Sequence, residues 1–125
     1  MTSPATQDRF PYQNQPIWSK SERAIARKAF EGALKRELHE VIQKAKRKCS
    51  QIKEPSDLWD LERYLTKRRI EIDTKYVFRA SRRTDVLGRL LQENRLSEEE
   101  LSGLREDKLG SIRSYARFLA KMDAA

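Results

Sequence analysis

This sequence of 125 residues is poor in residues that cross-link chains, break helices or span membranes. Its one cysteine, Cys49, cannot form an internal disulfide, so nothing indicates an oxidising compartment. It has no apolar run of the roughly 18 residues that a membrane-spanning helix needs, and its first residues lack the apolar segment of a secretion signal. We therefore expect a cytoplasmic protein that does not enter a membrane.

Motifs for catalysis and metal binding are also missing from the sequence. It has one histidine, His39, no glycine-rich phosphate loop, and no second cysteine or histidine with which to build a metal site. We interpret His39 as a surface or interface residue and Cys49 as a small core residue. The expected protein is therefore neither an enzyme nor the carrier of a cofactor.

What the sequence does contain is charge and helical periodicity. Charged residues make up 37 %, against four glycines and four prolines, and this balance is typical of long solvated helices. The prediction is an all-α fold. Residues 1–17 hold three of the prolines and no periodic pattern, so we expect a disordered tail there and one all-helical domain over residues 18–125.

Two long helices are expected first, at about residues 19–53 and 56–80. Ser19 and Glu22 have the spacing of a capping box, and Pro55 disfavours helix before it, with Ser56 or Asp57 placed to cap the second helix. The apolar stripe of the first helix consists of Phe30, Leu34, Leu38, Val41, Ala45, Cys49 and Ile52. Shorter helices are expected within about residues 84–122, with a stop at Asn94 and a second capping-box spacing from Ser97 to Glu100.

The second long helix carries two apolar stripes instead of one. The first stripe consists of Leu58, Leu61, Leu65, Ile72 and Tyr76. The second stripe, about 100° to 120° from Leu58, consists of Trp59, Ile70 and Val77. The strip between them is polar and holds Glu62, Thr66, Arg69 and Asp73. We expect Arg69 and Asp73, one helical turn apart, to form a partly desolvated ion pair.

Helix length points to the same arrangement as the second stripe. A helix of about 33 residues spans roughly 50 Å, whereas a compact chain of this size is about 36 Å across. One chain cannot enclose such a helix. We therefore predict an elongated symmetric dimer in which a second copy covers Trp59, Ile70 and Val77, with a smaller helical head at the C-terminal end.

The net charge of +8 leaves a second class of function open. The excess is concentrated in residues 19–54, which hold 11 basic and 5 acidic residues. A basic helical dimer could bind nucleic acid through Lys44 to Lys48 and the arginines between Arg79 and Arg83. A helical scaffold or assembly protein is a third alternative.

The central segment DLWDLERYLTKRRIEIDTKYVFR, residues 57–79, resembles the fluorescence recovery protein family of cyanobacteria. The matching residues are Asp57, Leu58, Trp59, Leu61, Arg69, Glu71, Ile72, Asp73, Lys75, Tyr76 and Arg79. Weaker similarity extends upstream through WSKSE and downstream through EELSGLREDK. The resemblance implies an all-helical dimer, without a cofactor, that binds the light-activated orange carotenoid protein and speeds its return to the dark form.

The resemblance also implies which residues meet a partner. Trp59 and Arg69 fall on positions important in the family, and Asp73, Ile70 and Val77 belong to the same region. Two positions beside them depart from the family, because its usual histidine is Glu62 here and its usual aspartate is Arg63. A second recognition patch, which the family builds with a phenylalanine and a lysine, corresponds to Asp85 and Ser111. These departures change the recognition surface and leave the dimeric framework intact.

Overall fold

The computed structural model describes residues 17–124 and confirms the all-α fold. Its elements are the helices α2 (Lys20–Ser50), α3 (Pro55–Lys75), α4 (Arg83–Gln92) and α5 (Glu106–Ala124), with short 3-10 helices η2 (Ala80–Arg82) and η3 (Glu98–Leu101). No strand occurs within the described range. The predicted disordered tail, apart from Ile17, lies outside the described residues.

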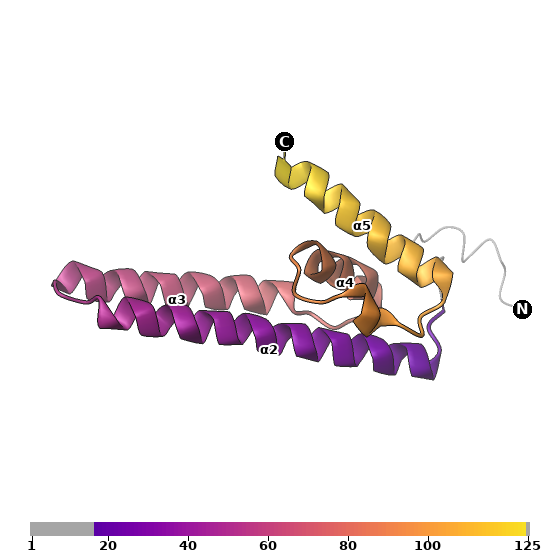
Figure 1. Cartoon of the computed structure of the whole chain (residues 1–125), viewed down its shortest axis with the longest axis horizontal. Helices are drawn as coiled ribbons and strands as arrows, with labels where there is room; N and C mark the ends of the chain where they lie inside the picture. The colour runs from indigo at the N-terminus through magenta and orange to yellow at the C-terminus, as the bar shows by residue number, and fades with distance from the viewer. Residues whose placement is uncertain (1–16, 125) are drawn as a thin grey trace, which may run out of the picture.

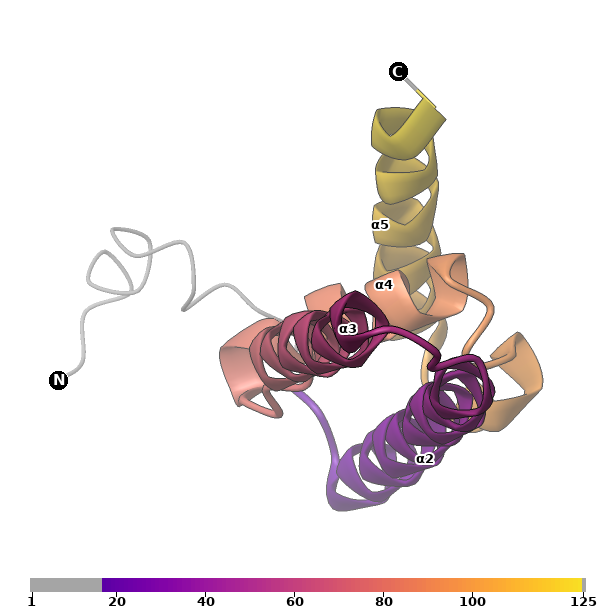
Figure 2. The same ribbon diagram turned by 90° about the vertical axis from the view of Figure 1, so that its left-hand side faces the viewer.

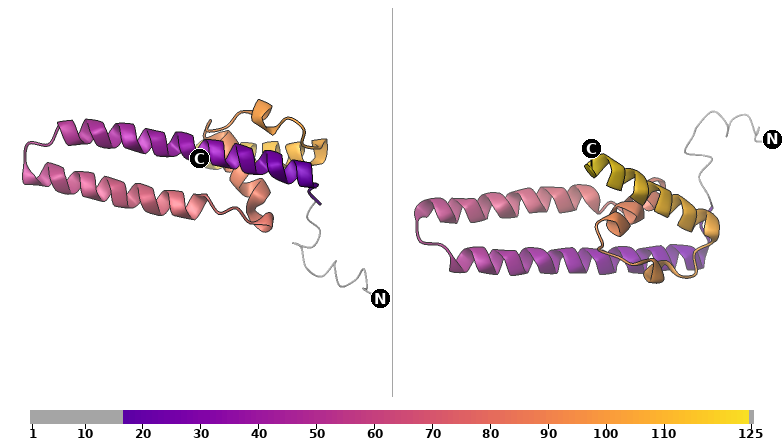
Figure 3. Two further views of the ribbon diagram at one scale, coloured as in Figure 1. Left: turned by 90° about the horizontal axis from the view of Figure 1, so that it is seen from below. Right: turned by 45° about the horizontal axis from the view of Figure 1, so that its top comes forward.

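Helices α2 and α3 run antiparallel as one long hairpin, which we call the stem (Figure 1). Residues 76–124, which we call the head, gather at the end of the stem where α2 begins and α3 ends (Figures 1 and 3). In the view along the stem, α4 lies between the hairpin and α5, and α5 projects away from it (Figure 2). The 31 residues of α2 give the stem a length of about 46 Å.

The first turn of α2 forms the capping box that the sequence predicts. The Ser19 hydroxyl accepts a hydrogen bond from the Glu22 amide at 3.1 Å, and the Glu22 carboxylate accepts one from the Ser19 amide at 2.9 Å. The Lys108 ammonium lies 3.2 Å from the carboxylate oxygen that accepts from Ser19, and the other oxygen accepts a hydrogen bond from the Arg105 amide at 2.9 Å. One buried carboxylate therefore joins the start of α2 to the start of α5.

The core lies between the N-terminal half of α2 and the head. Small side chains on α2 allow the head to approach closely, because Ala26, Ala29 and Ala33 are completely or almost completely buried. The remaining members of the core are Trp18, Phe30, Val86, Leu87, Leu90, Leu96, Leu101, Leu104 and Ile112.

The predicted apolar stripe of the first helix is therefore correct only near its start. Phe30 is buried, but Leu38 is 43 % exposed and Cys49 is exposed, so the interpretation of Cys49 as a core residue is wrong for this chain. The prediction followed the large apolar residues of α2, whereas the face of α2 that packs against the head is formed mainly by alanines.

Helix α3 begins at Pro55, with Glu54 and not Ser56 or Asp57 as its N-cap. Proline suits the first helical position because an amide hydrogen there would have no acceptor within the helix, so nothing is lost by its absence. Asp57 still stabilises the turn, since one carboxylate oxygen accepts hydrogen bonds from the Lys53 and Glu54 amides, both at 3.0 Å. The bonds from Glu54 and Lys53 lower the pKa of Asp57.

Helix α3 ends at Lys75, five residues before the predicted end at about residue 80. The chain then leaves the helix in a turn, and Tyr76 and Phe78 both pack on Phe30, with ring centroids 5.4 and 4.7 Å from that of Phe30. Val77 is therefore not on the helix. Its assignment to the second apolar stripe of α3 is wrong, because tertiary contacts of its neighbours override the helical period.

Close packing of α4 on α5 builds the head. At Gly88, an added Cβ atom would lie 2.8 Å from the Tyr115 ring and 3.1 Å from the Ile112 carbonyl oxygen. Asn94 adopts a φ of 60° just after α4, consistent with its predicted role as a stop. The capping box at Ser97 and Glu100 also forms, but it opens η3 instead of the long last helix.

Candidate protein-docking surface

The stem exposes more large apolar side chains than a lone surface hairpin would. Six of them are 40–60 % exposed, namely Leu38, Ile42, Leu58, Trp59, Leu65 and Ile70. Two come from α2 and four from α3. A patch of this kind on a small protein is typical of a protein–protein contact.

Both predicted apolar stripes of α3 contain exposed side chains. Trp59 and Ile70 of the second stripe are 56 % and 60 % exposed, so nothing in the described part of their own chain covers them. Leu58 and Leu65 of the first stripe are also exposed, at 46 % and 40 %. The better-covered positions on α3 are Asp57, Leu61, Tyr64, Arg68, Ile72 and Lys75.

The polar strip lies between the exposed apolar residues. Thr66 donates a hydrogen bond to Glu62 at 2.8 Å, and Arg63 pairs with Asp60. The expected ion pair of Arg69 and Asp73 is 3.9 Å long, with side chains 84 % and 72 % exposed, so within one chain it is not desolvated. An exposed pair at that distance contributes little to stability.

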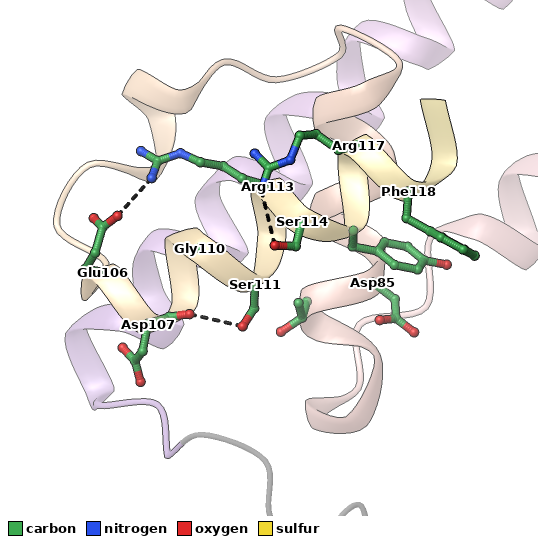
Figure 4. A pocket seen from close by; sticks show the side chains of 11 residues that line it. Asp85, Glu106, Asp107, Gly110, Ser111, Arg113, Ser114, Arg117 and Phe118 are labelled. Atoms are coloured by element: carbon green, nitrogen blue, oxygen red, sulfur yellow. Dashed lines mark hydrogen bonds and ion pairs between the residues drawn. The ribbon is translucent and has the colours of Figure 1, made fainter. Parts of the chain in front are cut away.

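The two residues that the resemblance implies for a second recognition patch line one groove in the head. Asp85 on α4 and Ser111 on α5 belong to a groove of about 810 Å³, and the Ser111 hydroxyl donates to the Asp107 carbonyl (Figure 4). Its apolar wall is formed by Tyr115 and Phe118, whose rings stack 6.1 Å apart. Phe118 is 53 % exposed, so this groove also offers uncovered apolar surface.

A second groove connects the head to the stem. It has a volume of about 580 Å³ and is lined by Ile70 of α3 together with Asp85 and Tyr115. The structure thus brings Ile70, Asp85 and Ser111 into one continuous surface. Trp59, near the start of α3, lies at the far end of the stem and takes no part in it (Figure 1).

A buried charge cluster lies at the stem–head junction and was not predicted from the sequence. Its centre is Glu37 on α2, whose side chain is completely buried. The Glu37 carboxylate accepts hydrogen bonds from Arg68 at 2.7 Å, from Lys75 at 2.9 Å and from the Tyr76 hydroxyl at 2.7 Å. Arg95 lies 3.2 Å from the same carboxylate and also pairs with Glu40. The cluster therefore ties α2 to the last turn of α3 and to the segment after α4.

Electrostatics explains why Glu37 stays ionised. Burial raises the pKa of Glu37, but the hydrogen bonds from Lys75, Tyr76 and Arg68 together lower it by more, so the net shift of the pKa is downward. For Tyr76, burial and the neighbouring carboxylate both raise the pKa. The signal in the sequence was the spacing of Glu37 behind Ala26, Ala29 and Ala33, which places the glutamate on the alanine face of α2.

The basic runs are partly occupied within the chain. The ammonium groups of Lys44 and Lys48 lie over the Tyr64 ring at 5.1 and 5.4 Å. Arg83 is buried, which leaves Arg79 and Arg82 as the exposed arginines of their segment. These contacts interrupt the basic face on which nucleic-acid binding would depend.

Two further observations concern residues 17–124 as a whole. None of the helices there has the length and apolar character needed to cross a membrane. Histidine, cysteine, aspartate and glutamate side chains in the same range do not come together in threes that could hold a metal ion.

Comparison with known proteins places this architecture in one family. Residues 18–116 match the family described as photoprotection regulator fluorescence recovery protein. The fluorescence recovery protein of Synechocystis sp. PCC 6803 is 38 % identical over 100 residues, which is 80 % of this chain and 92 % of that protein.

Solved structures agree with the sequence match. The structure of the fluorescence recovery protein of Fremyella diplosiphon has a TM-score of 0.77 at 38 % identity, covering 81 % of this chain and 99 % of that one. The structure from Synechocystis sp. PCC 6803 has a TM-score of 0.78 at 38 % identity and the same coverage. The chain therefore belongs to the fluorescence recovery protein family of photoprotection regulators.

Proposed function

We propose that this protein is a non-enzymatic regulator of photoprotection that acts in the cytoplasm as a homodimer. Its proposed partner is the orange carotenoid protein, or a protein with a domain related to the C-terminal domain of that partner. The observation that carries the proposal is the uncovered apolar face of the stem, in a chain of this family.

The dimer accounts for the exposed side chains of the stem. Burying a leucine, isoleucine or tryptophan side chain stabilises by roughly 1.5–3 kcal/mol, before the cost of association is subtracted. Twofold symmetry doubles the number of side chains that contribute. The same contact would desolvate the strip that holds Arg69 and Asp73, where ion pairs fix the register of the two copies.

Sedimentation at micromolar concentration tests the dimer. We expect the wild-type chain to sediment as a dimer and Trp59→Ala to shift it towards monomer, because the tryptophan is 56 % exposed in one copy. Met122→Ala is the matched control, since Met122 is similarly exposed, at 58 %, but lies on α5 outside the stem. A wild-type monomer would remove the argument, and a Trp59→Ala dimer of undiminished affinity would move the interface elsewhere.

The regulatory action is catalysis of a conformational change in the partner. A protein without reactive groups accelerates such a change only if it binds the transition ensemble more tightly than the activated form. The dimer offers two candidate contact regions, the polar strip beside Glu62 and Arg63 and the head groove at Asp85 and Ser111. Both carry side chains that differ from those usual in the family, so we expect altered partner preference.

Mixing the protein with photoactivated orange carotenoid protein tests this action directly. The expected result is a faster loss of red absorbance than in the partner alone. No acceleration by a confirmed dimer would contradict that partner. Binding to nucleic acid, the alternative, would instead weaken by orders of magnitude between low and moderate salt. A scaffold would bind a partner without changing its relaxation rate.

A further inference from the structure

Three arginines each contact one or both of the aromatic residues Trp18 and Phe78. Arg83, the first residue of α4, is only 9 % exposed, and its guanidinium carbon lies 4.9 Å from the centre of the Trp18 ring. The same guanidinium lies 5.8 Å from the ring of Phe78, and Arg27 lies 4.7 Å from that ring. Arg23 donates a hydrogen bond to the Trp18 carbonyl at 2.8 Å. We call Arg23, Arg27 and Arg83 the arginine cluster.

The arginine cluster lacks an anion of its own. Within residues 17–124, no carboxylate lies within 4.0 Å of Arg83 or Arg23, and Arg27 has only a 4.0 Å pair with exposed Glu31. Glu22, the acid next to Arg23 in sequence, is already occupied by the Arg105 amide and Lys108. Three arginines therefore contact Trp18 or Phe78 without a buried counter-charge among the described residues.

The most buried member is also unsatisfied in hydrogen bonding. The Arg83 Nε atom is buried and has no acceptor among the described residues. Burial, and then repulsion from Arg23 and Arg27, lower the pKa of Arg83. The aromatic faces of Trp18 and Phe78 offset part of the cost of burying the charge, but a ring face leaves the N–H groups in the guanidinium plane unbonded.

We propose that the arginine cluster is a binding site for one oxyanion group, a phosphate or a carboxylate, held chiefly by Arg83. A planar guanidinium with free N–H groups is the group that best matches two oxygens of such an anion. The bound anion accepts from Arg83 and neutralises Arg23 and Arg27, which approach from α2.

Binding there has a structural consequence. Phe78 belongs to the segment that connects α3 to α4 and Arg83 is the first residue of α4, whereas Arg23 and Arg27 belong to α2. An anion that contacts both parts fastens the connecting segment to the start of the stem. None of the three arginines lines the grooves that hold Asp85 and Ser111, so the inference does not depend on the proposed partner.

Nuclear magnetic resonance of the full chain provides the test, with the Trp18 indole and Arg83 Nε–H signals as reporters. Inorganic phosphate is titrated at constant ionic strength with chloride as the balancing ion, and acetate is titrated in parallel. We expect a saturable shift of both signals with phosphate. A shift with acetate as well identifies carboxylates as a second source of the anion. No saturable shift with either anion overturns the proposal.

Substitutions show whether the arginine cluster is responsible. Arg83→Met keeps an apolar contact with Trp18 and should weaken phosphate binding at least about tenfold, the loss expected for one charge-assisted contact. Arg27→Met, on the surface, should weaken it less and leaves folding unaffected. Arg79→Met is the control, because it removes the same charge from an exposed position of the segment before α4. Equal weakening by Arg79→Met would show that phosphate binding depends only on the overall charge of the protein, and this result would overturn the proposed site.

Discussion

At the residue scale, Glu37 is the buried charge on which the joint between stem and head depends. Replacing Glu37 with glutamine keeps its size but leaves Arg68, Lys75 and Arg95 around a neutral side chain. Removing one partner of a buried ion pair is strongly destabilising, so we expect Glu37→Gln to lower the free energy of unfolding by about 3 kcal/mol. Urea unfolding followed by circular dichroism measures the change.

Glu31→Gln on the same helix is the control for this prediction. Its side chain is 63 % exposed and its only ion pair is 4.0 Å long, so the substitution should change stability by less than about 0.5 kcal/mol. Equal effects of the two substitutions would mean that the charge cluster adds nothing beyond helix electrostatics.

Glu22 gives stability a defined dependence on pH. Hydrogen bonds from the Ser19 and Arg105 amides, aided by Lys108, lower its pKa from 4.5 to about 2. Because the folded chain then binds this proton less readily than the unfolded chain, the contribution is complete above pH 4.5 and is lost as the pH falls from about 4.5 to about 2. The difference in unfolding free energy between wild type and Glu22→Gln should therefore shrink over that window. A difference that is constant with pH would contradict the low pKa.

The two buried glutamates also show what could be read from the sequence residue by residue. Glu22 follows Ser19 at capping-box spacing, so its local role was predictable from a pattern only four residues long. Its second role, at Arg105, joins residues 83 positions apart. For Glu37, local spacing indicates only the face of α2 on which it lies, since its partners Arg68, Lys75 and Arg95 come from later parts of the chain.

At the scale of elements, the contact of α4 with α5 depends on Gly88. Gly88→Ala places a methyl group 2.8 Å from the Tyr115 ring and 3.1 Å from a backbone oxygen, which cannot move aside. Alanine favours a helix by up to about 1 kcal/mol over glycine, whereas overpacking costs about 1–3 kcal/mol. We therefore expect a net loss of about 1 kcal/mol in urea unfolding.

Gly110→Ala is the matched control, because the added methyl group has no heavy atom within 4 Å. It should stabilise the chain by about 0.5–1 kcal/mol through helix propensity alone. Stabilisation by both substitutions would show that the two helices separate easily, contrary to the tight packing at Gly88.

Helix ends were predictable where a local signal sets them and not where a distant contact does. Pro55 and Asn94 each act on their own backbone: α3 begins one residue before its expected start, and α4 ends two residues before Asn94. The first helix ends at Ser50, three residues before its expected end. The end of α3 has no such signal. It is set by Tyr76, which reaches Glu37, and by Phe78, which packs on Phe30 of another helix. Val77 was misplaced for that reason.

At the scale of the whole molecule, the exposed stem was predictable because it is a matter of periodicity and length. Trp59 and Ile70 were expected to lack cover in one chain, and they are 56 % and 60 % exposed. The head groove was not predictable from spacing, because Asp85 and Ser111 lie on different helices and meet only through the packing of α4 on α5. Their pairing came from the family resemblance alone.

The departures from the family that the resemblance implies at Glu62 and Arg63 give the last prediction. The double substitution Glu62→His with Arg63→Asp returns both positions to the usual family residues, and a reversed charge at a contact costs a few kcal/mol. We expect the variant to relax photoactivated orange carotenoid protein about tenfold faster than wild type, equivalent to about 1.4 kcal/mol. Losing the Arg63–Asp60 pair matters little, because its side chains are 67 % and 53 % exposed. Lys67→Gln changes the net charge of α3 by the same amount and should leave the relaxation rate unchanged. Acceleration by this control would mean that overall charge causes the effect. No acceleration by the double variant would mean that the partner is recognised by another part of the surface.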